Sequence, residues 1–421
     1  MRTIEPPTRQ SIHRRPSLNS PAPTRPKPLT ATLAYYAAFI TLGATVSIGG
    51  PALPWLAQNT ASRLNQISII FIAGSLGYML GSQLGGRAYD RFPGHRIQAL
   101  ALLVTSLSAA LVPVLHSLRF LVAVLFLLGT VQGALDVGCN TLLTWIHGEK
   151  VGPFMNGLHF FFGVGSFLAP LIFARVVLAA NDIRWAYWFF SLLALPVAAW
   201  FWFLPSPQIR KKTPEAATGR SINGLFLLIV FFFVFYVGLE IGYGNWIYTF
   251  STRLHLASET GAAYLTSAFW GAFAVGRLLG IGISTRLRPQ AILLTDLTGS
   301  LVAFAILLLW PDSPLALWAG TIVLGLSIAS IFATAMAFAE QRLRLTGALI
   351  GWILVGGGIG GMFFPWLIGQ LFERISPRIT MPVLLASTLI QFGLLLALIL
   401  PLQKKETAKD PAVVAIHRRI G

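Results

Sequence analysis

Acidic residues inside long apolar segments are the groups in this sequence that could do chemistry. Asp136 lies within the apolar segment 120–146, and Glu240 lies within the segment 223–250. A carboxylate at the centre of a membrane helix costs about 2.5 to 3.5 kcal/mol on insertion scales, so each acid needs a partner or a function. Such a group can bind a proton or a metal cation and can accept hydrogen bonds from a hydroxylated solute. Both acids are therefore candidates for solute binding or ion coupling.

Hydrogen-bonding side chains accompany the two acids at helical spacing. Gln132 and Asn140 each lie four residues from Asp136, which places all three on one helix face. Tyr243 lies on the same side of its helix as Glu240. A polar stripe on an apolar helix favours a cavity that recognises hydroxyl groups. The alternative is a structural hydrogen-bond network between helices.

Other charged residues have structural or functional interpretations. His159 could relay protons near neutral pH or could be an interfacial hydrogen-bonding residue, and the two interpretations are equally favoured. Arg277 and Asp296 stand at similar depths on either side of a short loop, and we predict that they form a buried structural ion pair. We predict a gating or structural role for Asp90 and Arg91, which lie in the loop after the second apolar segment.

Aromatic and sulfur-containing residues add little specificity. Trp246, Trp270 and Trp352 could stack on a sugar ring, but tryptophan is also common where helices meet lipid headgroups. Cys139 is the only cysteine, so one chain offers neither a disulfide nor a thiol-ligated metal site. The sequence contains no metal-ligand spacing, nucleotide-binding loop or nucleophile motif in a supporting context. We expect no metal, no cofactor and no enzymatic activity.

The elements that position these residues are membrane helices. The chain has 421 residues, of which 55% are hydrophobic and 11% charged, whereas soluble domains are about one-quarter charged. Apolar segments long enough to cross a bilayer recur along the chain. We predict an all-α membrane protein with twelve such helices, near 32–57, 66–88, 97–116, 120–146, 155–179, 184–204, 223–250, 260–284, 290–310, 315–339, 346–372 and 379–401.

The distribution of basic residues predicts the orientation. If both termini are inside, 23 of the 31 Lys and Arg residues lie in inner segments and seven in outer ones. An excess of Lys and Arg marks the cytoplasmic side. We therefore expect cytoplasmic termini in the plasma (inner) membrane, with the net charge of +17 near lipid and not on nucleic acid. An organellar transit peptide is an alternative interpretation of residues 1–30.

The sequence indicates an internal duplication. The polar linker 206–222 separates a predicted six-helix bundle, 31–205, from a second one, 223–401. Basic tails, 1–30 (Pro-rich and predicted to be disordered) and 402–421, flank them. At an offset of 195 residues, seven glycines of the first half align with glycines of the second, among them Gly43 with Gly238, Gly81 with Gly276, Gly85 with Gly280, Gly163 with Gly358, and Gly165 with Gly360. Matched glycines favour closely packed, pseudo-symmetric halves.

Several motifs resemble those of the major facilitator superfamily. The segment 86–96, GRAYDRFPGHR, resembles its loop signature with one extra residue before Gly94. A closer resemblance, to the fucose permease and sodium-dependent glucose transporter branch, rests on GALDVGCN at 133–140, MNGLH at 155–159, YVGLE at 236–240 and VGGGIG at 355–360. The resemblance covers about residues 33–401. It implies the major facilitator fold, with two six-helix bundles around a central cavity.

This resemblance also implies a function. We expect a secondary active transporter that works by alternating access. It would move a small polar solute of hexose type, coupled to a proton or sodium gradient. We expect it to work as a monomer. Efflux of drugs or metabolites is an alternative, but Gly165 and Pro170 are separated by four residues, so the Gly-Pro motif of many antiporters is absent. A non-transporting sensor with the same fold is a second alternative.

Overall fold

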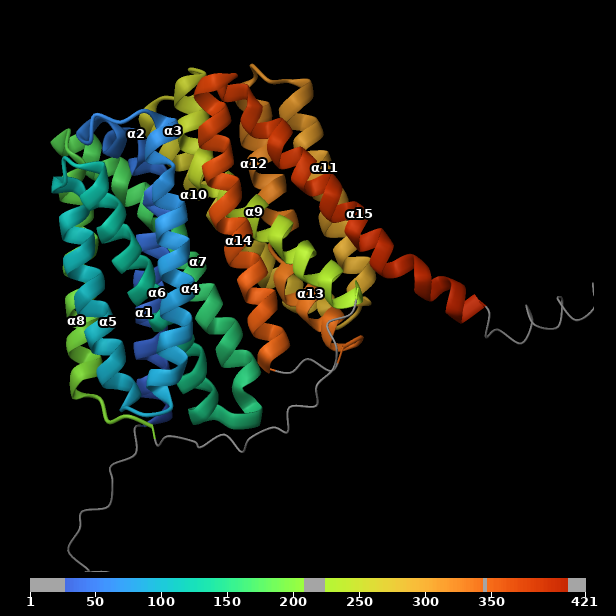
Figure 1. Ribbon diagram of the computed structural model, residues 1–421, viewed down its shortest axis with the longest axis horizontal. Coiled ribbons are helices and arrows are strands. Elements are labelled where there is room, and N and C mark those ends of the chain that lie inside the picture. Colours follow the sequence, from blue (N-terminus) through green and yellow to red (C-terminus); the bar gives the residue numbers. More distant parts are fainter. Residues whose placement is uncertain (1–26, 208–223, 344–346, 408–421) are drawn as a thin grey trace, which may run out of the picture.

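Within the described residues, twelve helical segments are long enough to cross the molecule. They run in alternating directions (Figure 1). The structure is a computed structural model that describes residues 27–207, 224–343 and 347–407. Most of the predicted tails, 1–30 and 402–421, and most of the linker 206–222 lie outside the described residues. The domain boundaries that those segments define therefore stay predictions.

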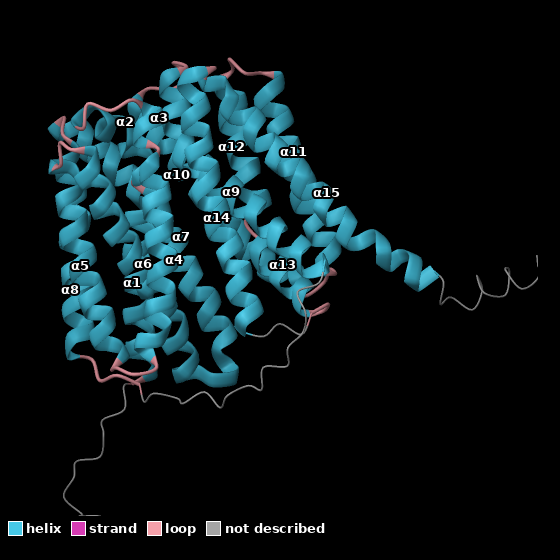
Figure 2. Ribbon diagram, viewed as in Figure 1, coloured by secondary structure: helices cyan, strands magenta, loops and turns pink. Residues whose placement is uncertain are grey.

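Every regular element in the described ranges is helical, as the apolar segments predict (Figure 2). Eleven segments are long and apolar enough to cross a membrane, and one of them, 118–180, contains two successive helices. The elements are α1 (Pro28–Ser47), α2 (Gly49–Asn59), α3 (Leu64–Ile67), α4 (Ile69–Tyr89), α5 (Gly94–Leu111), η1 (Val112–Val114), α6 (Leu118–His147), η2 (Gly148–Lys150), α7 (Val151–Ala180), α8 (Ile183–Phe203), α9 (Gly224–Arg253), α10 (Glu259–Ser284), α11 (Pro289–Leu309), α12 (Pro314–Ile328), α13 (Ile331–Glu340), α14 (Gly347–Arg374), η3 (Pro377–Ile379) and α15 (Thr380–Thr407).

These helices confirm the twelve predicted segments. The first and tenth crossings are each built from two helices, α1 with α2 and α12 with α13, which the apolar pattern did not reveal. The first helix begins at Pro28, because a proline in the first turn has no amide whose hydrogen bond would be lost. Gly148 reverses the chain between α6 and α7 with a φ of 55°, a conformation that strongly favours glycine.

Matched glycines occupy matched helix contacts in the two halves. A Cβ on Gly81 of α4 would lie 1.7 Å from the Thr130 carbonyl oxygen of α6. A Cβ on Gly276, the aligned residue of α10, would lie 2.7 Å from the Leu326 carbonyl oxygen of α12. Both glycines are therefore needed for close backbone approach. The α4–α6 pair is repeated as the α10–α12 pair, which supports the predicted duplication.

The two halves meet at one face of the molecule. We call it the closed face; it carries the turns around residues 60–63, 181–182 and 375–379. There the Leu64 amide donates a 2.8 Å hydrogen bond to the Glu373 carboxylate, across the boundary between the halves. Gln370 donates to the Asn65 carbonyl oxygen at 2.6 Å. These bonds join the end of α14 to the short helix α3.

The contacts between the halves continue only partway toward the opposite face. We call this the open face; it carries the turns around residues 90–93, 148–150 and 285–288. Midway along the helices, a Cβ on Gly358 would meet the Met79 sulfur at 2.6 Å, and one on Gly163 would meet Ala274 Cβ at 2.7 Å. Beyond this depth the C-terminal helices lean away from the N-terminal ones (Figure 1). The molecule is thus sealed at one face and separated at the other.

Side chains at the closed face cap the helices that begin there. Asp182 accepts a 2.8 Å hydrogen bond from the Arg184 amide at the start of α8. Ser258 accepts one from the Gly261 amide at the start of α10, at 3.1 Å. Each cap satisfies an amide that the first helical turn leaves without an intrahelical partner. Short, capped turns therefore hold the helix ends at this face.

Candidate solute and ion site

The first polar cluster surrounds Asp136 in the middle of α6. The Tyr78 hydroxyl of α4 donates a short hydrogen bond to the Asp136 carboxylate. The Asn140 amide donates to the same carboxylate at 2.9 Å and also to the Asp136 carbonyl oxygen at 2.9 Å. Asp136 and Asn140 are only half-buried. The carboxylate is thus held by two neutral donors and stays partly accessible.

Glycines in α4 and α6 bring Tyr78 to Asp136. A Cβ on Gly133 would lie 2.1 Å from the Tyr78 carbonyl oxygen, and one on Gly77 would lie 2.1 Å from the Phe126 carbonyl oxygen. This packing places the α4 backbone directly against the face of α6 that precedes Asp136. Sequence reasoning missed Tyr78. The glycine spacing through Gly77 and Gly81 was the available signal, because it marks the face of α4 that touches another helix.

The residues of the polar stripe predicted on α6 belong to two separate hydrogen-bonded groups. Asp136 and Asn140 form the cluster described above. Gln132 is buried and its amide donates a 3.0 Å hydrogen bond to the Thr45 hydroxyl of α1. Gln132 thus links α6 to α1, as the structural alternative expects of an interhelical bond. Its part in solute binding stays a prediction.

The second polar cluster joins the two halves around Arg277 of α10. The guanidinium of Arg277 interacts electrostatically with Glu240 of α9 and with His159 of α7. It also lies 4.4 Å from the centre of the Phe273 ring. The buried Tyr236 hydroxyl faces both Glu240 and Arg277 but makes no hydrogen bond of normal geometry. One positive charge therefore lies near the acid of its own half and near a histidine of the other half, and in the described ranges it forms no ion pair with that acid.

The predicted Arg277–Asp296 ion pair is wrong. Asp296 of α11 accepts a 2.5 Å hydrogen bond from the Ser330 hydroxyl, and Arg277 faces Glu240 instead. Helices α10 and α11 are consecutive but barely touch, because α12 packs between them. Equal depth in adjacent segments predicted proximity, but the order of helices around the bundle separates the two charges.

The remaining predicted residues lie apart from both clusters. Tyr243 is buried, and its hydroxyl shares a 2.7 Å hydrogen bond with Thr321 of α12. Asp90 and Arg91 are exposed at the open face, where Asp90 is the C-cap residue of α4. In the described part of the chain neither forms an ion pair. Their gating or structural role stays a prediction.

The tryptophans considered for ring stacking differ in their environment. The Trp246 indole donates a 2.9 Å hydrogen bond to the Pro365 carbonyl oxygen in the core. Trp270 is buried against Phe269 and Phe273. Trp352 is 56% exposed. Trp246 and Trp270 therefore act as packing residues in this conformation.

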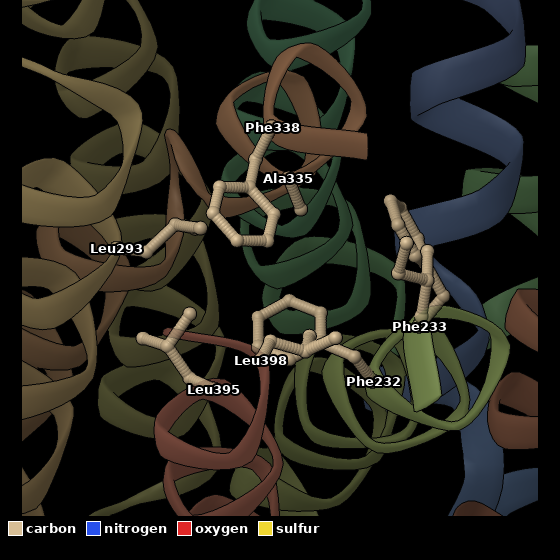
Figure 3. Close-up of a pocket in the computed structure, with 8 residues that line it drawn as sticks. Phe232, Phe233, Leu293, Ala335, Phe338, Leu395 and Leu398 are labelled. Carbon is tan, nitrogen blue, oxygen red and sulfur yellow. The ribbon is translucent and has the colours of Figure 1, made fainter. Parts of the chain in front are cut away.

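An apolar pocket in the C-terminal half is too small to be a solute site. Figure 3 shows Phe232, Phe233 and Phe338 converging on it from α9 and α13, with Leu395 and Leu398 from α15. It holds about 10 Å³ of free space, which is about the volume needed for one water molecule. Its lining offers no polar side chain. The polar clusters around Asp136 and Arg277 are therefore the candidate site.

Two polar clusters, one on each side of a boundary between two similar helix bundles, define a membrane transporter of the alternating-access type. The model of the Major Facilitator Superfamily matches residues 35–365. The chain belongs to this superfamily.

Comparisons with individual proteins agree. Sodium-dependent glucose transporter 1A of Mus musculus is 32% identical over 374 residues, covering 80% of this chain and 88% of the relative. Sodium-dependent glucose transporter 1 of Homo sapiens is 31% identical over 392 residues, covering 84% and 75%. A crystal structure of the nucleoside transporter NupG superposes with a TM-score of 0.73 at 14% identity, covering 88% of this chain and 99% of that one. The last likeness confirms the fold.

Proposed function

We propose that this protein moves a hexose-like sugar across a membrane, coupled to a sodium or proton gradient. The proposal rests on one observation: each half of the molecule holds one half-buried carboxyl group, Asp136 in the N-terminal half and Glu240 in the C-terminal half. Relatives with more than 30% identity are named as sodium-dependent glucose transporters. Carboxylates, amides and tyrosine hydroxyls are the groups that bind sugar hydroxyls by hydrogen bonds.

The two clusters have different parts in this proposal. Asp136 and Asn140 bind solute hydroxyls from the N-terminal half, with Tyr78 fixing the carboxylate. Glu240 lies near the positive charge of Arg277, so an arriving cation or proton changes the local charge balance. A coupling group must favour its ion in one conformation and release it in the other. Because Arg277 also lies near His159 of the other half, such a charge change can act on both halves.

The open face is cytoplasmic in this proposal, and the protein lies in the plasma (inner) membrane. The support is that segments predicted to share a side by their basic residues do share a face. Labelling with a membrane-impermeant maleimide in intact cells tests this. We expect Arg63→Cys at the closed face to react and Lys211→Cys in the central linker to react only after permeabilisation. Labelling of Lys211→Cys in intact cells contradicts the orientation.

Transport by purified protein in proteoliposomes tests the function. Labelled hexoses are supplied with an imposed inward sodium gradient, an imposed proton gradient, or neither. We expect one gradient to raise internal sugar above the external concentration, and unlabelled sugar to compete. If neither gradient drives accumulation of any hexose, although the protein is folded and inserted, the sugar symport proposal is wrong.

A further inference from the structure

The tenth membrane crossing is interrupted in its middle. Helix α12 ends at Ile328 and α13 begins at Ile331, although both lie on one continuous apolar segment. Among the described residues, the backbone amides of Ala329 and Ser330 donate no backbone hydrogen bond of normal geometry. The carbonyl oxygens of Gly325 and Leu326, four residues earlier, therefore lack their helical donors. Within a bilayer such groups need another partner.

An acidic side chain lies beside this interruption. Asp296 of α11 accepts the 2.5 Å hydrogen bond from the Ser330 hydroxyl. A serine at a helix N-cap usually accepts from the helix's own amides, but Ser330 makes no such bond. In the described ranges no basic residue pairs with Asp296. The Asp296 carboxyl group is thus held by a neutral hydroxyl and not by a basic side chain of the described ranges.

Further oxygen atoms face the same place. A Cβ on Gly299, one turn beyond Asp296 on α11, would lie 2.4 Å from the Ser327 hydroxyl. Ser327 and Ser330 therefore lie along the face of α12 and α13 that meets Asp296. From the other side, α10 presents Gly276, and a Cβ there would lie 2.7 Å from the Leu326 carbonyl oxygen. Close packing at these glycines brings the oxygen atoms of Ser327 and Leu326 against the neighbouring helices.

We propose that this junction binds Na⁺, with the Asp296 carboxylate, the Ser330 and Ser327 hydroxyls and carbonyl oxygens of the interrupted helix as candidate ligands. Interrupted membrane helices coordinate Na⁺ in this way, through freed carbonyls and half-helix C-terminal ends. The C-terminal end of α12 carries negative partial charge, which also favours a cation. A single carboxylate balances a monovalent ion, whereas divalent ions in proteins usually draw on more than one.

The proposed ligands belong to other helices than the candidate sugar site. Asp296 lies on α11 and Ser327 on α12, and Ser330 lies between α12 and α13, whereas Asp136, Glu240 and Arg277 lie on α6, α9 and α10. This proposal is independent of the proposed function, which places the ion-responsive charges at Glu240 and Arg277. Na⁺ binding can therefore be tested without sugar and without transport.

Equilibrium binding of radioactive Na⁺ to the full-length protein in detergent tests the proposal. The comparison includes the wild type, Asp296→Asn, Ser330→Ala, Asp136→Asn from the candidate sugar site, and a control, Asp312→Asn. Asparagine keeps an oxygen that accepts from Ser330, so the first variant removes the charge and keeps the local bond. Asp312 is exposed at the closed face and pairs with Arg378 at 2.5 Å, away from the junction.

We expect saturable binding to the wild type and the control, at least tenfold weaker binding to Asp296→Asn, and a smaller loss for Ser330→Ala. If Asp296→Asn fails to fold, Ser330→Ala carries the test, because it leaves the carboxylate in place. Unchanged Na⁺ affinity in the folded variants overturns the site. So does a folded wild type that binds no Na⁺, or loss of binding in Asp136→Asn but not in Asp296→Asn. If sodium binds as expected but no sugar is transported, the site stands and the proposed function fails.

Discussion

The closed face depends on one glycine whose replacement has a calculable effect. A Cβ on Gly369 of α14 would lie 2.4 Å from Ser68 Cβ and 3.1 Å from the Trp246 ring. Both neighbours are packed, so Gly369→Ala must push α14 away from Ser68. Overpacking of this kind costs about 1 to 3 kcal/mol. If the cost falls only on the conformation sealed at this face, its population relative to the opposite conformation drops by about 5- to 150-fold.

Distances between spin labels measure this shift. Labels at Arg63→Cys and Arg374→Cys, both exposed at the closed face on opposite halves, report its opening, and the native Cys139 is buried. We expect Gly369→Ala to move the distance distribution toward longer values.

Gly393→Ala is the matched control, because a Cβ there meets no atom within 4 Å. Replacing glycine by alanine raises helix propensity by about 1 kcal/mol at either position, but only Gly369→Ala introduces a clash. If both variants give the wild-type distribution, the contact does not limit closure and the reasoning is refuted.

Three further predictions concern the candidate site. We expect Asp136→Asn and Glu240→Gln to fold, to retain exchange or solute binding, and to lose gradient-driven accumulation in proteoliposomes; wild-type accumulation in both would contradict their coupling role. Arg277→Ala should lower the melting temperature because it removes the positive charge near the Glu240 carboxyl, and adding Glu240→Gln should restore part of that loss; no restoration would refute the electrostatic coupling. Tyr78→Phe should raise the KM for sugar several-fold with little loss of stability, as removal of one hydrogen bond costs about 1 kcal/mol; an unchanged KM would assign the hydroxyl a structural role.

The helices could be predicted from sequence because the bilayer imposes a simple rule. About twenty apolar residues are needed per crossing, and the twelve apolar segments all became helical. The interruption at Ala329 and Ser330 escaped this rule. Both residues are compatible with a helix, so hydropathy cannot distinguish a continuous crossing from a broken one.

The site could be predicted only in part. Asp136 and Asn140 lie on one helix, so their 2.9 Å hydrogen bond follows from spacing alone. The partners of Glu240 and Asp296 depend on which helices are neighbours, and the sequence contains no direct measure of that order. For this reason Arg277 was assigned to the wrong acid. Tyr78 was missed because its contact depends on glycines of two different helices.

The duplication extends to the contacts that seal the closed face. Shifting Gly369 and Ser68 by the 195-residue repeat leads to Ala174 and Ala263, on α7 and α10. These two alanines lie together in one buried cluster with Tyr248. The contact of α14 with Ser68, which lies between α3 and α4, and the contact of α7 with α10 are therefore equivalent, and each is made by small residues. A rocking motion about the pseudo-symmetry axis must break both together, so strain at Gly369 weakens the seal on both sides of the axis.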